Sequence, residues 1–113
     1  MKIKFFPITL GPMRQVTLRG LALKEKLEKV GLRVFETYPG AAQDIWGIPR
    51  QKDPQGLKQG LKRFKLIGNW LSPGVTKDEL DALTCAIIAR EDLGGNTIAI
   101  GDPDEGLMIL PRK

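Results

Sequence analysis

The sequence contains no histidine and a single cysteine among its 113 residues. Without histidine, the chain can form neither a histidine-based catalytic dyad nor a histidine-ligated zinc site. Cys85 has no partner for a disulfide within the chain, and its apolar neighbours predict a buried thiol. Any metal site in this protein must therefore be built from carboxylates.

Aromatic residues are also few, at 6% of the chain. This low content argues against a dedicated binder of single-stranded nucleic acid, because such proteins stack bases on aromatic rings. No stretch reaches membrane-spanning length and no signal-peptide pattern is present, so we expect a cytoplasmic protein with no membrane partner. The chain does have 42% apolar residues and a net charge of +5. These values predict one folded domain over residues 1–113 and permit an anionic partner such as nucleic acid.

The most strongly marked element is a helix predicted from Thr76 to about Leu93. Thr76 and Glu79 have the identity and spacing of a capping box, in which each side chain accepts a hydrogen bond from the other residue's backbone N–H. Residues 82–89 carry no charge. A helix with such a segment is expected to be buried on most of its sides.

Predicted helices and strands alternate along the rest of the chain. This order favours an α/β fold, and its sheet should be mixed because the last two strands form a hairpin. The predicted elements are an extended arm at 1–16, a helix at 17–30, a strand at 32–37, helices at 41–48 and 55–67, and strands at 97–100 and 106–110.

Three acidic residues are candidates for a metal site. Asp78 and Asp81 lie about 60° apart on the helical wheel and therefore share a face. Glu36 lies near the carboxyl end of a predicted strand, where ligand sites gather in open α/β sheets. Carboxylates so placed suit a hard cation such as Mg²⁺. The simpler interpretation is that Asp78 serves the helix cap together with Glu79, that Asp81 is a solvated acid of the first turn, and that Glu36 faces solvent at the end of its strand.

The densest basic region follows the short helix that is predicted to end at residue 48. Its side chains could follow the phosphates of a nucleic acid, or they could form an ordinary solvated helix face. The candidate nucleic-acid-binding residues are Arg50, Lys52, Lys58, Lys62 and Lys65.

Several short segments occur in an order and spacing typical of a known family. They are residues 5–9, 18–20, 36–44, 47–50, 78–82 and 101–106, followed by Pro111. Together they resemble the domain-of-unknown-function family 429, a group of predicted nucleases with a ribonuclease H-like fold. The Asp-x-x-Asp-Ala pattern at Asp78 to Ala82 also resembles the Holliday-junction resolvase branch of that fold.

The resemblance implies a function as well as a fold. It implies a ribonuclease H-like mixed sheet with helices, and a site in which Glu36, Asp78 and Asp81 hold Mg²⁺ or Mn²⁺ for phosphodiester hydrolysis. The Gly-Ile-Asp and Ile-Asp-x-Pro motifs of the family's first strands do not occur in this sequence. The resemblance therefore covers the C-terminal half of the family domain, and we expect a truncated protein that is inactive as a nuclease.

Other functions remain open at this point. The chain could be a non-catalytic module that binds nucleic acid or protein, or a fragment without function that is stable only by self-association. A ribonuclease H-like domain without its first strands has an open sheet edge, which favours pairing with another chain. We therefore expect a homo-oligomer, with the arm at residues 3–10 or the strand at 32–37 in the interface.

Overall fold

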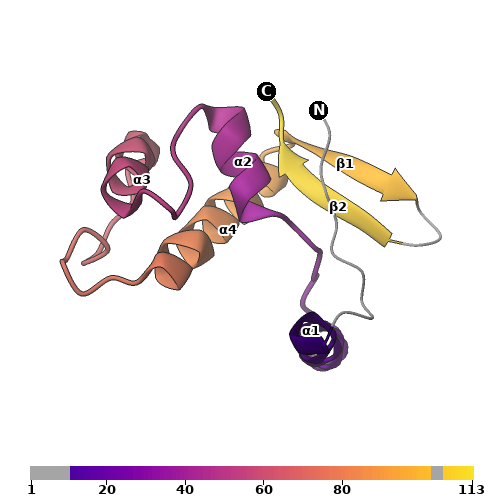
Figure 1. Ribbon diagram of the computed structural model, residues 1–113. Coiled ribbons are helices and arrows are strands. Elements are labelled where there is room, and N and C mark those ends of the chain that lie inside the picture. The colour runs from indigo at the N-terminus through magenta and orange to yellow at the C-terminus, as the bar shows by residue number, and fades with distance from the viewer. Residues whose placement is uncertain (1–10, 103–105) are drawn as a thin grey trace. The chain divides into compact units, whose positions relative to one another are not determined.

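The computed structural model describes residues 11–102 and 106–113 of the chain. Its backbone divides into two compact units, residues 1–35 and residues 36–113. Within the described residues the fold is mixed α/β, with a two-stranded antiparallel sheet, and no helix is long and apolar enough to cross a membrane. The elements are α1 (Gly11–Lys29) in the first unit, and α2 (Pro39–Trp46), α3 (Pro54–Leu61), the 3₁₀ helix η1 (Lys62–Phe64), α4 (Lys77–Leu93), β1 (Thr97–Asp102) and β2 (Gly106–Pro111) in the second (Figure 1).

Helix α4 begins with the predicted capping box. The Glu79 N–H donates to Thr76 Oγ1 and the Thr76 N–H donates to Glu79 Oε1, both at 3.1 Å. The two hydrogen bonds satisfy backbone donors that the first turn of any helix leaves free. The predicted capping box is therefore confirmed.

The expectation that α4 is buried on most sides is wrong. Helix α4 is buried along one face only, because the packed elements of the second unit do not surround it. The opposite face carries alanines, whose small side chains leave little apolar area in water. The buried residues are Leu80, Thr84, Ile87 and Ile88, and the exposed alanines are Ala82, Ala86 and Ala89.

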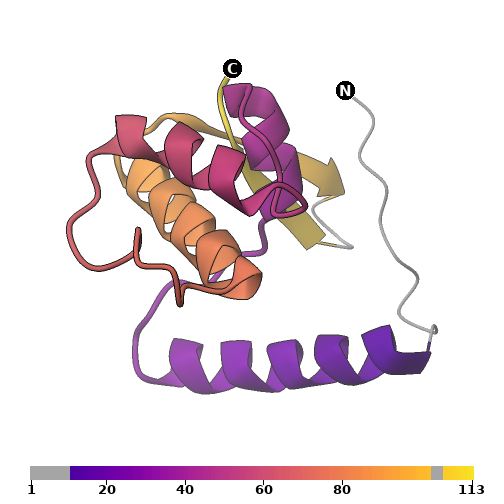
Figure 2. The same cartoon turned by 60° about the vertical axis from the view of Figure 1, so that its left-hand side comes forward.

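The core of the second unit forms where α3 packs against α4 (Figure 2). Leu57 and Leu61 are completely buried in one cluster with Leu80 of α4, as the spacing of leucines in α3 predicts. A Cβ atom on Gly60 would lie 2.6 Å from the Ile48 side chain, so glycine allows α3 to approach this segment closely. The packing of α3 therefore depends on large side chains toward α4 and on a glycine toward Ile48.

The two C-terminal strands form the predicted hairpin. Strands β1 and β2 pair antiparallel in a register that sets Thr97 opposite Pro111 and Asp102 opposite Gly106. Ile109 and Leu110 of β2 are buried, and β2 contacts both α2 and α4. The hairpin therefore covers the end of the helical layer (Figure 1).

The strand predicted at residues 32–37 is reduced to one β-bridge. Glu36 pairs parallel with Met108, and the Ile109 N–H donates to the Glu36 carbonyl oxygen at 2.9 Å. The described residues offer this segment no strand on its other side, and α2 begins immediately afterwards at Pro39. In place of the predicted mixed sheet, the described residues form a hairpin with a single parallel bridge. The ribonuclease H-like fold stays a prediction.

The extended arm predicted for residues 1–16 is wrong from Gly11 onward. Helix α1 begins at Gly11, six residues before the predicted start. The proline at position 12 is compatible with this start, because the N–H that proline lacks has no partner in the first turn of a helix. Residues 1–10 lie outside the described part of the chain, so the homo-oligomer expected through residues 3–10 stays a prediction.

Replacing Thr76 by alanine should lower the free energy of unfolding by about 1 kcal/mol, because the Glu79 N–H loses its acceptor. Thr76→Ser keeps the hydroxyl and should retain most of the stability. Urea denaturation followed by circular dichroism measures both variants. Equal losses for serine and alanine would show that the methyl group, and not the cap, supplies the stability.

Candidate functional site

The structure does not bring the three candidate acids together. Glu36 is exposed at the bridge to β2, Asp78 is exposed in the first turn of α4, and Asp81 is half-buried against α2. Within residues 11–102 and 106–113, no three aspartate, glutamate or cysteine side chains are grouped so that they could hold a metal ion. The expected convergence on Mg²⁺ or Mn²⁺ is therefore not found in the described residues.

Asp81 belongs instead to a polar cluster between α2 and α4. Gln43 is completely buried, and its Nε2 atom donates to Asp81 Oδ1 at 3.0 Å and to Thr84 Oγ1 at 2.9 Å. The Thr84 hydroxyl in turn donates to the Leu80 carbonyl oxygen. The opposite amide orientation would turn Gln43 Oε1 toward a carboxylate, so chemistry fixes the orientation. Gln43 Oε1 is buried and accepts no hydrogen bond from the described residues.

The Asp81 carboxylate also affects the pKa of the neighbouring Cys85 thiol. Burial raises the pKa of Cys85 above its ordinary value, and the negative charge of Asp81 raises this pKa further. Both effects disfavour the thiolate, which is the nucleophilic form of cysteine. Cys85 is therefore unsuited to act as a catalytic nucleophile at neutral pH.

Lys58 does not belong to an exposed basic surface. Only 5% of this residue is exposed, and its Nζ atom donates to the Ser72 carbonyl oxygen at 3.1 Å. The loop that follows η1 supplies this backbone acceptor, while the aliphatic part of the Lys58 side chain is buried. Lys58 therefore stabilises this loop, and its burial does not favour the predicted contact with phosphate.

Arg50 is held by two neighbouring side chains. It forms a two-point ion pair with Asp44, in which Nε donates to Oδ1 at 3.0 Å and Nη2 donates to Oδ2 at 2.5 Å. Its Nη1 atom donates to the Tyr38 hydroxyl at 3.1 Å. The ion pair lowers the pKa of the Asp44 carboxyl below its ordinary value, and Arg50 stays protonated. The guanidinium of Arg50 is therefore paired although the residue is exposed, and the candidate residues Lys52, Lys62 and Lys65 are exposed as well.

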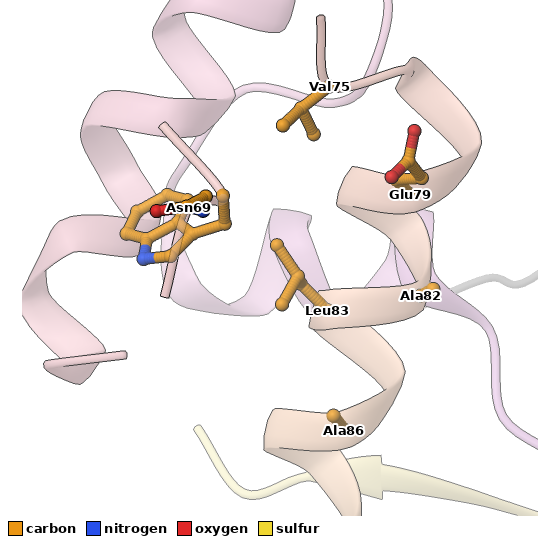
Figure 3. A pocket seen from close by; sticks show the side chains of 7 residues that line it. Asn69, Val75, Glu79, Ala82, Leu83 and Ala86 are labelled. Carbon is orange, nitrogen blue, oxygen red and sulfur yellow. The ribbon is translucent and has the colours of Figure 1, made fainter. Parts of the chain in front are cut away.

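An open groove of about 440 Å³ runs along the start of α4 (Figure 3). One wall consists of side chains that project from successive turns of α4, and the other comes from the loop between η1 and α4. Most of the lining is apolar, and its polar members are one amide and one carboxylate. The lining residues are Asn69, Trp70, Val75, Glu79, Ala82, Leu83 and Ala86.

The walls of this groove are fixed by the core beneath them. Trp70 is 8% exposed, and its indole N–H donates to the Leu66 carbonyl oxygen at 3.3 Å. Val75 and Leu83 are half-buried and pack against the same core cluster. A groove whose walls are already packed requires little rearrangement to receive a ligand.

The sequence gives weak signals for these features. Gln43 lies in a short predicted helix between two alanines and the charged Asp44, a setting that does not indicate a buried amide. Trp70 lies in a stretch rich in glycine and proline, where an aromatic residue indicates a loop packed on the core. The groove depends on how that loop folds back, which no spacing along the chain encodes.

The comparisons with known proteins identify no relative. No family model matches the chain, and searches of curated proteins and of solved structures return no match. The resemblance to family 429 therefore rests on the quoted segments alone and stays a prediction.

Asp81→Asn should make Cys85 react faster with iodoacetamide near neutral pH. Removing the negative charge lowers the pKa of the thiol, so the thiolate forms at lower pH. The measurement is the alkylation rate of the folded protein as a function of pH. Asp78→Asn is the matched control on the exposed side of the same helix and should leave the profile unchanged. Equal shifts for both variants would contradict the assignment to Asp81.

Proposed function

We propose that this chain is a non-catalytic module that binds a partner protein by receiving an apolar side chain in the groove beside α4. The observation that carries the proposal is the groove itself, with apolar walls packed on the core and one carboxylate at its edge. Such a combination of apolar surface and few polar groups is typical of sites that bind an apolar ligand group.

The charge at the groove favours protein over nucleic acid as the ligand. The hydrogen bond that the Thr76 backbone N–H donates to Glu79 Oε1 lowers the pKa of the Glu79 carboxyl, so it stays ionised at neutral pH. Asp78 adds a second negative charge in the same turn of α4. Negative charges repel phosphates, and the burial of Trp70 leaves little ring surface on which a base could stack.

A metal-dependent nuclease of the ribonuclease H-like type is the second candidate. Its support is the family resemblance and the hydrogen bond from Gln43 to Asp81, since metal-binding carboxylates are commonly oriented by such neighbours. Mg²⁺ or Mn²⁺ would need further carboxylates close to Asp81, and the described residues supply no group of three. This arrangement favours the non-catalytic function.

The purified chain should therefore cleave neither DNA nor RNA in the presence of Mg²⁺ or Mn²⁺. The test incubates single-stranded and double-stranded substrates with the wild-type protein and with Asp81→Asn. An incomplete set of carboxylates cannot hold the ions that stabilise the attacking and leaving oxygens. Metal-dependent cleavage by the wild type, lost in Asp81→Asn, would overturn the non-catalytic assignment in favour of the nuclease.

Groove binding can be tested with small apolar probes. Titration with N-acetyl-leucine amide or indole should shift the NMR signals of Val75, Leu83 and Ala86. Ala86→Glu fills the groove and adds charge, so it should weaken probe binding by about tenfold or more. Ala89→Glu is the matched control, since Ala89 is also exposed on α4 but does not line the groove.

Two results would contradict groove binding. One is a set of NMR shifts spread over the surface without preference for the groove. The other is an equal loss of binding in Ala86→Glu and Ala89→Glu, which would indicate a general effect on α4. Circular dichroism of both variants separates these results from unfolding.

A further inference from the structure

Helix α1 carries a regular row of small and apolar residues along one face. Gly20, Leu23 and Leu27 of the helix, and Val30 directly after its last residue Lys29, follow one another at intervals of three, four and three residues. This spacing is that of the a and d positions of a coiled coil, which meet a facing helix along one seam. These four residues are called the α1 seam below.

The α1 seam is largely exposed. The exposed fractions are 56% for Leu23 and 73% for Val30, and Leu27 is half-buried. A Cβ atom on Gly20 would meet no atom within 4 Å, so nothing in the described residues fills the space at this position. Most of the stability of a helix in a protein comes from packing of its apolar face rather than from helix propensity. The seam is therefore suited to a helical partner.

The opposite side of α1 does not offer a second seam. Leu18 and Leu21 are about half exposed, but the same spacing continues into Glu25 and Glu28. These glutamates form exposed ion pairs with Lys29 and Lys24, at 3.9 Å in each case. The apolar row on this side is thus interrupted after two residues, and the α1 seam is the longer continuous face.

Basic residues flank the α1 seam on both sides. Arg19 and Lys26 occupy the position before each a residue, and Lys24 occupies the position after Leu23. In a coiled coil these flanking positions face the flanking positions of the partner helix and determine partner choice. The partner is therefore expected to carry acidic residues there.

The same charges disfavour pairing of α1 with α1 of a second copy. In a parallel pair, Arg19 of one helix would face Lys24 of the other, and in an antiparallel pair basic residues would also face basic residues. Like charges at these positions repel. An anionic membrane or nucleic acid would meet the positive flanks but would not match a narrow apolar row, which fits between the side chains of one facing helix.

We infer that α1 is a docking helix for an acidic amphipathic helix of a partner protein. The α1 seam packs against the partner's apolar row, and Arg19, Lys24 and Lys26 pair with carboxylates on either side of that row. The exposed seam and its flanking charges carry this inference, which is independent of the groove beside α4.

The test uses the full chain and two synthetic helical peptides as probes. Both carry leucine at the seam positions, one with glutamate and the other with lysine at all flanking positions. Titration calorimetry should find the glutamate peptide bound at least about tenfold more tightly than the lysine peptide. Binding should weaken as salt is raised, because the flanking pairs are exposed.

Two variants locate the contact. Leu27→Asp should abolish binding of the glutamate peptide, whereas Leu18→Asp, on the opposite side of α1, should retain it. The double variant Lys24→Glu, Lys26→Glu should reverse the preference toward the lysine peptide, a result that loss of folding cannot produce. Circular dichroism checks that all variants keep their helix content.

Several outcomes would overturn the inference. Equal affinity for the two peptides, or equal effects of Leu27→Asp and Leu18→Asp, would remove the seam as the contact. Binding only to anionic vesicles or to duplex DNA would show that the basic residues beside the seam contact a membrane or a nucleic acid and not a protein. Absence of binding, with α1 amides already protected from hydrogen exchange in the free protein, would show that the seam is covered by this chain or by a second copy.

Discussion

Burial of one face of α4 is the interaction on which the second unit depends. Leu80, Thr84, Ile87 and Ile88 supply that face, and α2, α3 and β2 all pack against this helix. Full burial of each large apolar side chain contributes on the order of 1.5–3 kcal/mol before entropy is counted. The capping box at Thr76 fixes where the helix begins, and thereby which residues of α4 face the core and which face the groove.

The division of α4 into two faces also explains the placement of its acids. Asp81 lies at the border of the buried face and accepts a hydrogen bond from the Gln43 amide, whereas Asp78 lies in the exposed first turn. Two carboxylates on neighbouring turns thus have different surroundings. Sequence spacing correctly sets them about 60° apart, but spacing alone does not tell which neighbour each one contacts.

Local signals predicted the helices and the hairpin well. The capping box at Thr76, the leucine spacing in α3 and the pattern of the last two strands all act within a few positions of the chain, and the structure agrees with each. The strand expected near Glu36 was wrong because strand formation depends on a partner distant in sequence, which the described residues provide only at Met108.

Long-range contacts decide the surroundings of the candidate site residues. Lys58 has the helical position of a solvated lysine, but the returning loop supplies the Ser72 carbonyl as its acceptor. Arg50 lies in a polar loop, yet Asp44 and Tyr38 from the neighbouring helix region hold its guanidinium. Hydrogen bonds and burial in the fold make a basic residue less available to a ligand, and sequence patterns do not report the neighbours that provide them.

The buried amide of Gln43 has a consequence for the alignment of α2 on α4. Apolar contacts between two helices change little when one helix slides by a turn, since one aliphatic side chain can replace another. The two hydrogen bonds of Gln43 to Asp81 and Thr84 can form at one longitudinal position only. Displacement along α4 would leave further buried polar atoms without partners, so Gln43 selects a single alignment of the two helices.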